Sequence, residues 1–366
     1  MKAECLITNF KAAVAQIEKV AGKNLTLPIL GAILIQTDDA GLVLRATNLN
    51  IGAELRVPAK VSEHGTIAVS AQLLGQITNG LSGDAPVSLE SVNDNLVIKT
   101  KHAKMTVKSM NADDFPTLPH IKAADVFEIP TELFVLGVKS VAYAASQSDI
   151  KPEIASIYLY PENDHLVFVA TDAFRLAEKK IPARDVAQFP EILIPVKNIG
   201  EIVRILGEYQ GTVGVSVAEN QISFTNDQLY LTSRLTAGTY PPYRQIMPKE
   251  SKTEAIMLRG DLQGILKSMM VFSDKYNQID VAINPTEKTI TFTSQNGDTG
   301  EGVVSAEAAL SGQGIETRMN QRYISDALQS ISVDSVSFSF TEPNRAMVMR
   351  GVGDQSFTYL VMPMNR

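Results

Sequence analysis

Three stretches of the sequence decide the fold: LVLRATNL (42–49), LVFVATDA (166–173) and TITFTSQN (289–296). In each, apolar residues alternate with other residues at the period of two that is typical of a β-strand. Thr47, Thr171 and Ser294 occupy matching places in them, 124 and 123 positions apart. One third of 366 residues is 122, so a repeat of this length fills the chain three times.

Two sets of helical patterns recur at nearly the same period. Both sets begin at or next to residues that favour helix starts. The first starts are Asn9, Thr131 and Asp261, 122 and 130 positions apart, and the second are Ser70, Pro195 and Asn320, 125 positions apart each time. Apolar stripes at helical spacing follow the first starts: Phe10, Val14 and Ile17; Phe134, Val138, Val141 and Ala145; Leu262, Ile265, Leu266 and Met269.

A hairpin pattern follows each second helix and completes the repeat. The expected turns are Asn93-Asp94, Glu219-Asn220 and Pro343-Asn344, and each unit closes with a strand, KMTVKSM, LYLTSRL or SFTYLVM. Strands joined by tight turns are antiparallel, and helices with one apolar face each cover one side of a sheet. We therefore predict an α+β fold of three two-helix, antiparallel-sheet domains at 1–120, 125–247 and 253–366, with Pro-bearing linkers near 117–125 and 247–253, in which a sheet extends from one unit to the next.

The charge is distributed unevenly between the expected helices and the rest of the chain. The net charge is −7, so the strongly basic balance of a typical nucleic-acid binder is absent. The six helical spans nevertheless carry ten basic and six acidic residues, a charge of +4, which leaves −11 elsewhere. A basic helical face on an acidic body suits a protein that holds a polyanion on one side. The alternative is that Lys and Arg occur there because they are good helix formers.

Catalytic signatures are missing from the sequence. We find no GxxxxGK[ST] loop, HExxH, CxxC or GxSxG motif, and we expect no cofactor and no metal site. Asp172 and Arg175 resemble a catalytic pair, but at three residues apart we interpret them as a local charge-assisted hydrogen bond. We interpret Cys5 as a buried small apolar group. Without a signal peptide or an apolar run of about 18 residues, we expect a soluble, cytoplasmic protein.

The last strand, YLVMPMNR, places Leu360, Met362 and Met364 at alternate positions near a chain end. Met-rich termini often form adaptable binding surfaces. The alternative is that this strand completes the core of its own unit, and the sequence alone leaves both readings open.

The chain resembles the bacterial sliding clamps, the beta subunits of DNA polymerase III. The resemblance runs over the whole length and is carried by LTLPILGAILIQ (25–36), NADDFP (111–116), VATDAFRLA (169–177), YPPYRQIMP (240–248) and VMPM (361–364). It implies a non-catalytic processivity factor: two copies join head to tail in a ring whose helices surround double-stranded DNA without reading its sequence. The implied partners are the DNA polymerase III alpha subunit, the clamp loader, and other polymerases and repair proteins.

The resemblance also implies site residues. Ala173 and Phe174 stand where the family usually has Gly and His, and Gln72 replaces a usual arginine. The ring joint would be formed by Met105 and Val107 on one side and Val271 and Phe272 on the other. DNA contact would involve Lys23, Asn24, Gln72, Lys197 and, from the helix charge, Arg322; the pocket for a partner peptide would comprise Ile154, Thr171, Ala173, Phe174, Arg175, Leu176, Pro241, Ile246, Leu360, Met362 and Met364.

Two other classes of protein stand beside the clamp. An enzyme that uses Asp172 and Arg175 is disfavoured because no nucleophile, metal set or phosphate loop accompanies them. A repeat scaffold that binds only proteins differs from a clamp in one property, which is retention on circular DNA.

Overall fold

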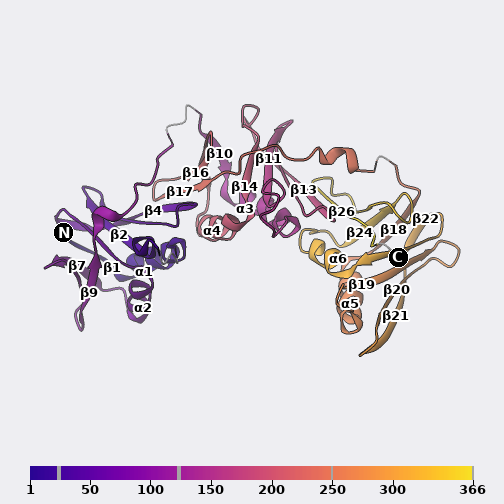
Figure 1. The fold of residues 1–366 in the computed structure, drawn as a ribbon, viewed down its shortest axis with the longest axis horizontal. Coiled ribbons are helices and arrows are strands. Elements are labelled where there is room, and N and C mark those ends of the chain that lie inside the picture. Colours follow the sequence, from indigo (N-terminus) through magenta and orange to yellow (C-terminus); the bar gives the residue numbers. More distant parts are fainter. Residues whose placement is uncertain (23–25, 122–124, 249, 365–366) are drawn as a thin grey trace. The chain divides into compact units, whose positions relative to one another are not determined.

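A computed structural model describes residues 1–22, 26–121, 125–248 and 250–364. The chain forms two compact units (Figure 1). Unit 1 comprises Met1–Glu132 and Lys197–Leu235, and unit 2 comprises Leu133–Val196 and Thr236–Arg366. The boundaries cut through the second sequence repeat, because its strands are divided between the sheets of the two units.

Unit 1 is built on one antiparallel sheet of thirteen strands within the described residues. Their order is β10 (Phe127–Pro130), β15 (Thr212–Ala218), β16 (Gln221–Thr225), β17 (Leu229–Arg234), β4 (Ile51–Pro58), β3 (Gly41–Thr47), β2 (Ala32–Asp38), β6 (Thr66–Ser70), β9 (Lys104–Met110), β8 (Asn95–Lys99), β7 (Pro86–Val92), β1 (Lys2–Leu6) and β5 (Lys60–Glu63).

The described residues of unit 2 form two antiparallel sheets. The larger has the order β14 (Ile192–Pro195), β11 (Ser156–Glu162), β12 (His165–Thr171), β13 (Arg175–Pro182), β26 (Phe357–Val361), β25 (Met347–Gly351), β24 (Ser335–Phe340), β18 (Thr253–Leu258) and β22 (Ala309–Gly312). The smaller has the order β21 (Gly300–Glu307), β20 (Thr289–Asn296), β19 (Gln278–Asn284) and β23 (Ile315–Asn320).

Two strand pairs join the repeats, as the sequence predicts. In unit 1, β17 of the second repeat pairs with β4 of the first, with Thr232 opposite Gly52. In unit 2, β26 of the third repeat pairs with β13 of the second, with Leu360 opposite Leu176. The sheet therefore continues from one repeat to the next inside each unit.

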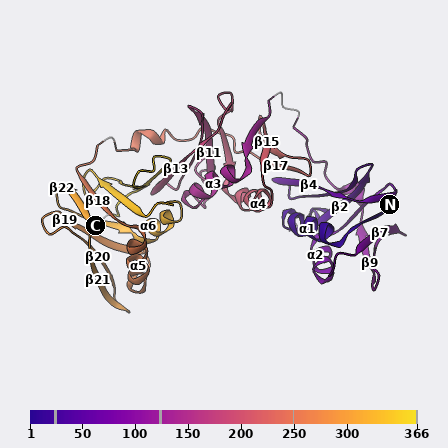
Figure 2. The same ribbon diagram turned by 180° about the vertical axis from the view of Figure 1, so that it is seen from behind.

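In the part of the chain that the structure describes, each repeat has two α-helices, and the predicted stripes lie on their buried faces. They are α1 (Ile7–Ile17), α2 (Ala71–Gly80), α3 (Thr131–Val141), α4 (Val196–Leu206), α5 (Arg259–Met269) and α6 (Gln321–Leu328). Phe10, Val14 and Ile17 are buried on α1, as are Leu262 and Leu266 on α5. α1 packs against α2, and α5 packs against α6 (Figures 1 and 2).

Short 3₁₀ helices extend some of these helices or lie in the connections. They are η1 (Glu18–Val20), η2 (Pro28–Gly31), η3 (Ala112–Asp114), η4 (Ala142–Ala144), η5 (Tyr243–Ile246) and η6 (Met270–Phe272). η5 lies directly before the predicted linker at 247–253 between the second and third repeats, and it takes part in the candidate site.

The two faces of the larger sheet in unit 2 have different neighbours. Phe168 on β12 makes an edge contact with Phe134 of α3 at 5.5 Å between ring centroids. Successive side chains of a strand point to opposite faces. Val167 and Val169 therefore lie on the face away from α3, where they form one cluster with Leu176, Leu360, Tyr240 and Tyr243. We call this side the outer face of the sheet.

Candidate functional site

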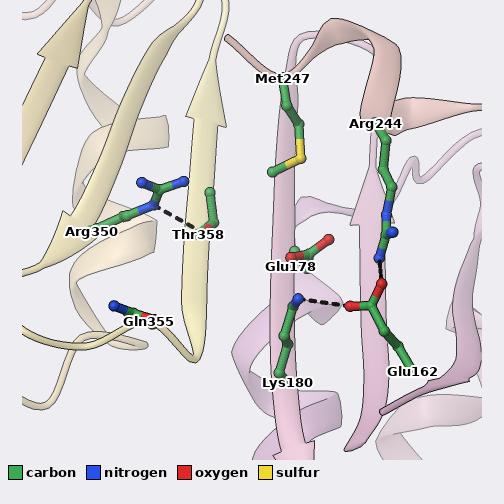
Figure 3. Close-up of a pocket in the computed structure, with 8 residues that line it drawn as sticks. All are labelled: Glu162, Glu178, Lys180, Arg244, Met247, Arg350, Gln355 and Thr358. Atoms are coloured by element: carbon green, nitrogen blue, oxygen red, sulfur yellow. Dashed lines mark hydrogen bonds and ion pairs between the residues drawn. The ribbon is translucent and has the colours of Figure 1, made fainter. Parts of the chain in front are cut away.

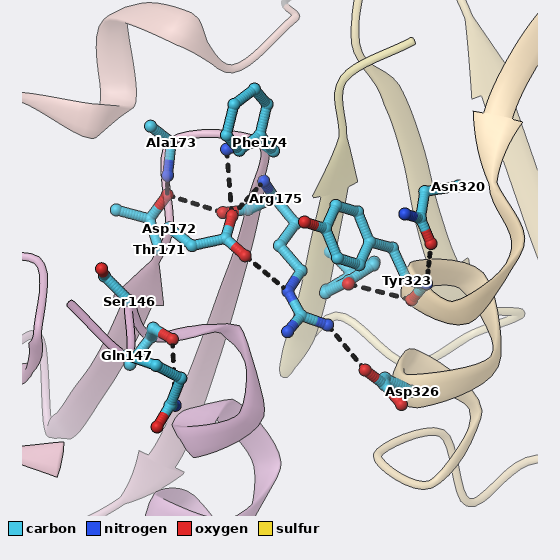
Figure 4. Close-up of polar contacts among 12 residues, drawn as sticks. Ser146, Gln147, Thr171, Asp172, Ala173, Phe174, Arg175, Asn320, Tyr323 and Asp326 are labelled. Carbon is cyan, nitrogen blue, oxygen red and sulfur yellow. Dashed lines mark hydrogen bonds and ion pairs between the residues drawn. The ribbon is translucent and has the colours of Figure 1, made fainter. Parts of the chain in front are cut away.

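The sequence VATDAFRLA forms a tight turn between β12 and β13 (Figure 4). The Thr171 hydroxyl donates to the carbonyl of Arg175 at 2.6 Å. Asp172 Oδ1 accepts the backbone N–H groups of Phe174 at 3.0 Å and Arg175 at 2.9 Å. Ala173 has a φ of +75°, a conformation that costs energy for a residue with a Cβ. This turn leaves the Phe174 ring 63% exposed.

The first repeat forms the same turn with different residues. Asn48 Oδ1 accepts the N–H groups of Asn50 and Ile51, and Leu49 has a φ of +72°. Its next strand, β4, has Gly52 at the place where the second repeat has Leu176. A Cβ on Gly52 would lie 2.5 Å from Leu118 Cδ2, so Leu118 packs directly on the backbone there. The second repeat instead presents an aromatic ring and a cation at its turn.

Arg175 is held by groups from both sides of the repeat junction. Its Nε donates to Asp172 Oδ2 at 3.0 Å, and its Nη1 donates to Asp326 Oδ2 on α6 at 2.7 Å. The guanidinium carbon lies 4.3 Å from the ring centroid of Tyr323 (Figure 4). The predicted local hydrogen bond is confirmed. Arg175 also ties the second repeat to the third, and sequence reasoning missed Asp326 and Tyr323 as its partners.

The residues expected to line a cleft divide into an exposed and a buried set. Phe174, Ile246 and Met362 are 63%, 57% and 40% exposed. Met362 N–H donates to the carbonyl of Phe174 at 2.8 Å, which holds the last residues against the turn. We call Phe174, Ile246 and Met362 the apolar rim. The other exposed or half-buried members of the set are Ala173, Pro241, Ile154, Arg175 and Met364.

Leu360 and Leu176, which are predicted to line the pocket for a partner peptide, do not lie at the surface. They are 3% and 1% exposed, because β26 is inserted between β25 and β13 and both leucines enter the cluster on the outer face. Thr171 is also buried. The last strand therefore completes its own core through Leu360 and reaches the surface through Met362, which combines the two readings of the sequence.

A cavity of about 470 Å³ lies farther along the outer face of the same sheet (Figure 3). None of the predicted cleft residues lines it. It was missed because its residues alternate with core residues inside strands such as RLAEKK. Its walls are Glu162, Glu178, Lys180, Arg244, Met247, Arg350, Gln355 and Thr358, which we call the charged pocket.

The predicted DNA-contact residues have exposed side chains where they can be described. Gln72 lies on α2, Lys197 on α4 and Arg322 on α6. Lys23 and Asn24 lie outside the described residues. Two of the ten basic residues counted for the helices already form ion pairs within the protein. Arg318 lies on β23 and pairs with Asp280, and Arg204 pairs with Glu201 on α4. The count of +4 therefore overstates the positive charge that is free to attract DNA.

The four residues predicted for a ring joint differ in exposure. Val271 on η6 is 66% exposed, while Met105 on β9 is half-buried. Phe272 is half-buried and packs on the backbone of Gly302, where a Cβ would lie 2.5 Å from its ring. Val107 is only 2% exposed. Its side chain is therefore buried within unit 1, and a contribution of Val107 to the ring joint would come from its backbone.

Cys5 is a buried free cysteine. Burial, with a smaller contribution from Glu4, raises the pKa of the Cys5 thiol to about 12, so it stays protonated at neutral pH. Its predicted burial is confirmed. Among the described residues, no group of three or more His, Cys, Asp or Glu side chains is arranged to hold a metal ion. No helix in the described part of the chain is long and apolar enough to cross a membrane.

Comparisons with known proteins agree over the whole chain. Family models of the DNA polymerase III beta subunit match in chain order: the N-terminal domain at residues 1–119, the central domain at 128–242 and the C-terminal domain at 244–365. The beta sliding clamp of Synechocystis is 26% identical over 99% of both chains. That of Bacillus subtilis is 27% identical over 96% of both.

Solved structures show the same fold. The sliding clamp of Bacillus subtilis matches with a TM-score of 0.94 and 24% identity, covering 100% of this chain and 99% of that one. The sliding clamp of Pseudomonas aeruginosa bound to griselimycin matches with a TM-score of 0.95 and 24% identity over 100% of both chains. The three-repeat α+β architecture is therefore that of solved sliding clamps.

Proposed function

Because this chain belongs to the DNA polymerase III beta subunit family, whose members are non-catalytic sliding clamps, we propose that two copies form a head-to-tail ring around double-stranded DNA. In this proposal the ring acts in the cytoplasm, slides without sequence preference, and tethers the polymerase III alpha subunit, the clamp loader and other replication or repair proteins. Each copy would consist of three domains, at 1–120, 125–247 and 253–366. These bounds are close to the spans of the three family models.

Two strand edges support the ring joint. β21 stands at the end of its sheet, in the place that β4 and β13 hold in the other repeats. β9, the closing strand of the first repeat, pairs with β8 along its length but with β6 only through Ser109 and Met110. The equivalent closing strands β17 and β26 pair along both edges. One joint needs both open edges, so β21 of one copy would pair with β9 of the other.

The repeat fixes the register of that joint. Gly302 lies opposite Ser294, as Gly52 lies opposite Thr47. Thr106 on β9 corresponds to Thr232 on β17, because each lies opposite the third residue of the preceding strand, Val97 on β8 or Ser223 on β16. Since Gly52 pairs with Thr232, Gly302 should face Thr106 of the second copy. The next pair is then Val303 with Met105.

The observation that carries this proposal is the exposure at one repeated position. Ala53 and Ala177 are fully buried where they face Leu231 and Tyr359 at the two closed junctions. Val303 holds the same position in the third repeat and is 59% exposed. An apolar residue on an open strand edge invites pairing with another chain. Two copies supply two such joints, and the ring closes without further growth.

The sequence-independent hold on DNA rests on charge. Lys139, Lys197, Lys267 and Arg322 are exposed on α3, α4, α5 and α6, and none of them takes part in an ion pair within the described residues. Mobile lysines and arginines attract phosphates without reading bases. A closed ring needs only such weak contacts, because topology keeps it on the DNA.

The tethering of partners rests on the apolar rim. Three large exposed side chains surround a turn that Asp172, Thr171 and Arg175 fix in one conformation. We propose that a short linear motif of each partner places Leu or Phe side chains against this rim, with Leu176 and Leu360 beneath it. Each buried side chain contributes about 1.5–3 kcal/mol. This gives weak binding, so that partners exchange.

The ring joint is tested with Val303→Asp and the control Val352→Asp, which charges an apolar residue that is 43% exposed in a turn of unit 2. Sedimentation velocity at low protein concentration should give twice 39.7 kDa for the wild type and the control, and 39.7 kDa for Val303→Asp. A dimer that survives Val303→Asp would show that the joint lies elsewhere. A monomeric or trimeric wild type would contradict the six-repeat ring and favour a scaffold of another kind.

A further inference from the structure

The charged pocket continues the outer face on which the apolar rim lies. Every second side chain of a strand points to the same face. On β13 these are Leu176, Glu178 and Lys180, and on β26 they are Leu360 and Thr358. Leu360 belongs to the apolar cluster, while Thr358 lines the pocket. Met247 packs against the cluster and also lines the pocket. The face therefore changes from apolar to charged within two residue pairs along the same strands.

A shared carboxylate pairs with two of the cations in the pocket. Lys180 Nζ lies 2.7 Å from Glu162 Oε2, and Arg244 pairs with Glu162 Oε1 (Figure 3). Burial alone would raise the pKa of Glu162, but the hydrogen bonds from Lys180 and Arg244 outweigh it and lower that pKa. Glu162 therefore stays ionised at neutral pH, and the three groups together carry a charge of +1.

The second carboxylate of the pocket is engaged from within the protein. Glu178 is 6% exposed and accepts a hydrogen bond from the Tyr243 hydroxyl. Tyr243 and Tyr160 share a hydrogen bond of 2.7 Å, and Arg244 Nη2 donates to Tyr160 at 2.6 Å. This chain of hydrogen bonds links Glu178 to a cation through two tyrosines. Glu178 is thus shielded from a ligand by its burial.

Arg350 is an exposed cation of the pocket, and unlike Lys180 and Arg244 it is not paired with Glu162. Its Nε donates to Thr358 Oγ1 at 3.2 Å, and within the described residues its guanidinium takes part in no ion pair (Figure 3). Counting Arg350, the pocket holds three cations and two carboxylates. A guanidinium with unused donors favours a carboxylate, which it can bind through two parallel hydrogen bonds.

We propose that the charged pocket binds an acidic residue, Asp or Glu, in the segment of a partner peptide that flanks the apolar anchors. The inference rests on the proposed function, because the apolar rim must hold the anchors first. The pocket lies next to the rim because both belong to the outer face. Its excess positive charge favours a negatively charged residue in the flanking segment of the peptide. The carboxylate would pair with Arg350 while Lys180 and Arg244 remain on Glu162. Partners would then compete through their flanks as well as their anchors.

The test uses fluorescein-labelled peptides with two Leu and one Phe as anchors and an Asp-Glu, Ala-Ala or Lys-Lys pair at either end. Anisotropy titrations are run against the full chain, Arg350→Gln and the control Lys288→Gln, which removes an exposed charge in the turn between β19 and β20. We expect one acidic-flank peptide to bind the wild type about three- to tenfold more tightly than the Ala-Ala peptide, as one partly shielded ion pair allows. Arg350→Gln should abolish that gain, Lys288→Gln should keep it, and 1 M salt should reduce it.

The outcomes separate this inference from the proposed function. Equal binding of acidic and neutral flanks, a gain that survives in Arg350→Gln, or tighter binding of the Lys-Lys peptide would overturn the acidic pocket and leave the apolar rim intact. A wild type that binds none of the peptides would overturn both. Arg350 is exposed, so Arg350→Gln should melt at the wild-type temperature; a large loss of stability would mean that Arg350 acts on the fold and would also contradict the proposal.

Discussion

Replacing Phe174 by Ala should weaken partner binding without affecting the fold. The ring is 63% exposed, and its turn is held by backbone groups and by Thr171 and Asp172, which the substitution keeps. Of the roughly 200 Å² that an aromatic side chain can bury, about 125 Å² is then free. If a bound peptide covers about half of it, the loss is about 60 Å² at 25 cal/mol per Å², or roughly 1.5 kcal/mol. This corresponds to about tenfold in Kd.

Calorimetric titration of a peptide with Leu and Phe anchors measures this loss, and thermal melting follows stability. The matched control is Leu136→Ala, which removes an apolar side chain that is 46% exposed on α3. We expect about a tenfold rise in Kd for Phe174→Ala, no change for Leu136→Ala, and wild-type melting for both. Wild-type affinity in Phe174→Ala would refute the placement of the rim, as would an equal loss in the control.

Three further predictions concern the chain end, acid stability and DNA. Deleting residues 362–366 removes Met362 from the rim and should weaken peptide binding at least tenfold, seen by calorimetry, while sedimentation still shows a dimer; equal affinity would mean that the strand serves only its own core. The pKa of Glu162 is lowered in the folded chain, so its ionised form stabilises the fold above the pKa of the unfolded chain, and this stabilisation is lost as the pH falls through the lower, folded value. Glu162→Gln should therefore reduce the melting temperature more at pH 7 than at pH 3; an equal reduction at both pH values would exclude an ionic role. Changing Lys197 and Arg322 to Gln together should lower the salt dependence of retention on any duplex by about one unit of slope for each phosphate that is no longer neutralised, and a weakening confined to particular sequences would argue against a sequence-independent hold.

Local chemistry made much of the fold predictable. Ser70 and Asn320 cap α2 and α6 as expected, with side chains that accept the N–H groups of Leu73 and Tyr323. Asn93 and Asp94 adopt the positive φ values of a tight hairpin turn. These features depend on a few neighbouring residues, and the sequence contains all of them.

Helix starts that depend on tertiary packing were predicted less well. α1 begins at Ile7 and not at Asn9, and α5 begins at Arg259 and not at Asp261. In both cases the preceding strand runs directly into the helix, and the cap residue, Leu6 or Leu258, offers no side-chain acceptor. The expected third hairpin also differs, because β24 and β25 are joined by residues 341–346 and not by a two-residue turn.

The candidate site shows the same division between local and distant contacts. The turn around Asp172 and the exposure of Met362 follow from short motifs. The ion pair between Arg175 and Asp326 joins residues 151 positions apart, and no local pattern indicates it. The burial of Leu360 depends on the insertion of β26 between two strands, which the apolar alternation at a chain end does not specify.

The central claim, a ring that encircles DNA, is tested most directly by retention on DNA of different topology. The protein is loaded onto nicked circular plasmid by a bacterial clamp loader and ATP, and the complex is separated from free protein by gel filtration. We predict that the chain elutes with the circular DNA and dissociates once a restriction enzyme linearises the plasmid. Equal retention on linear DNA, or no retention on the circle while a known clamp is loaded in parallel, would contradict the ring.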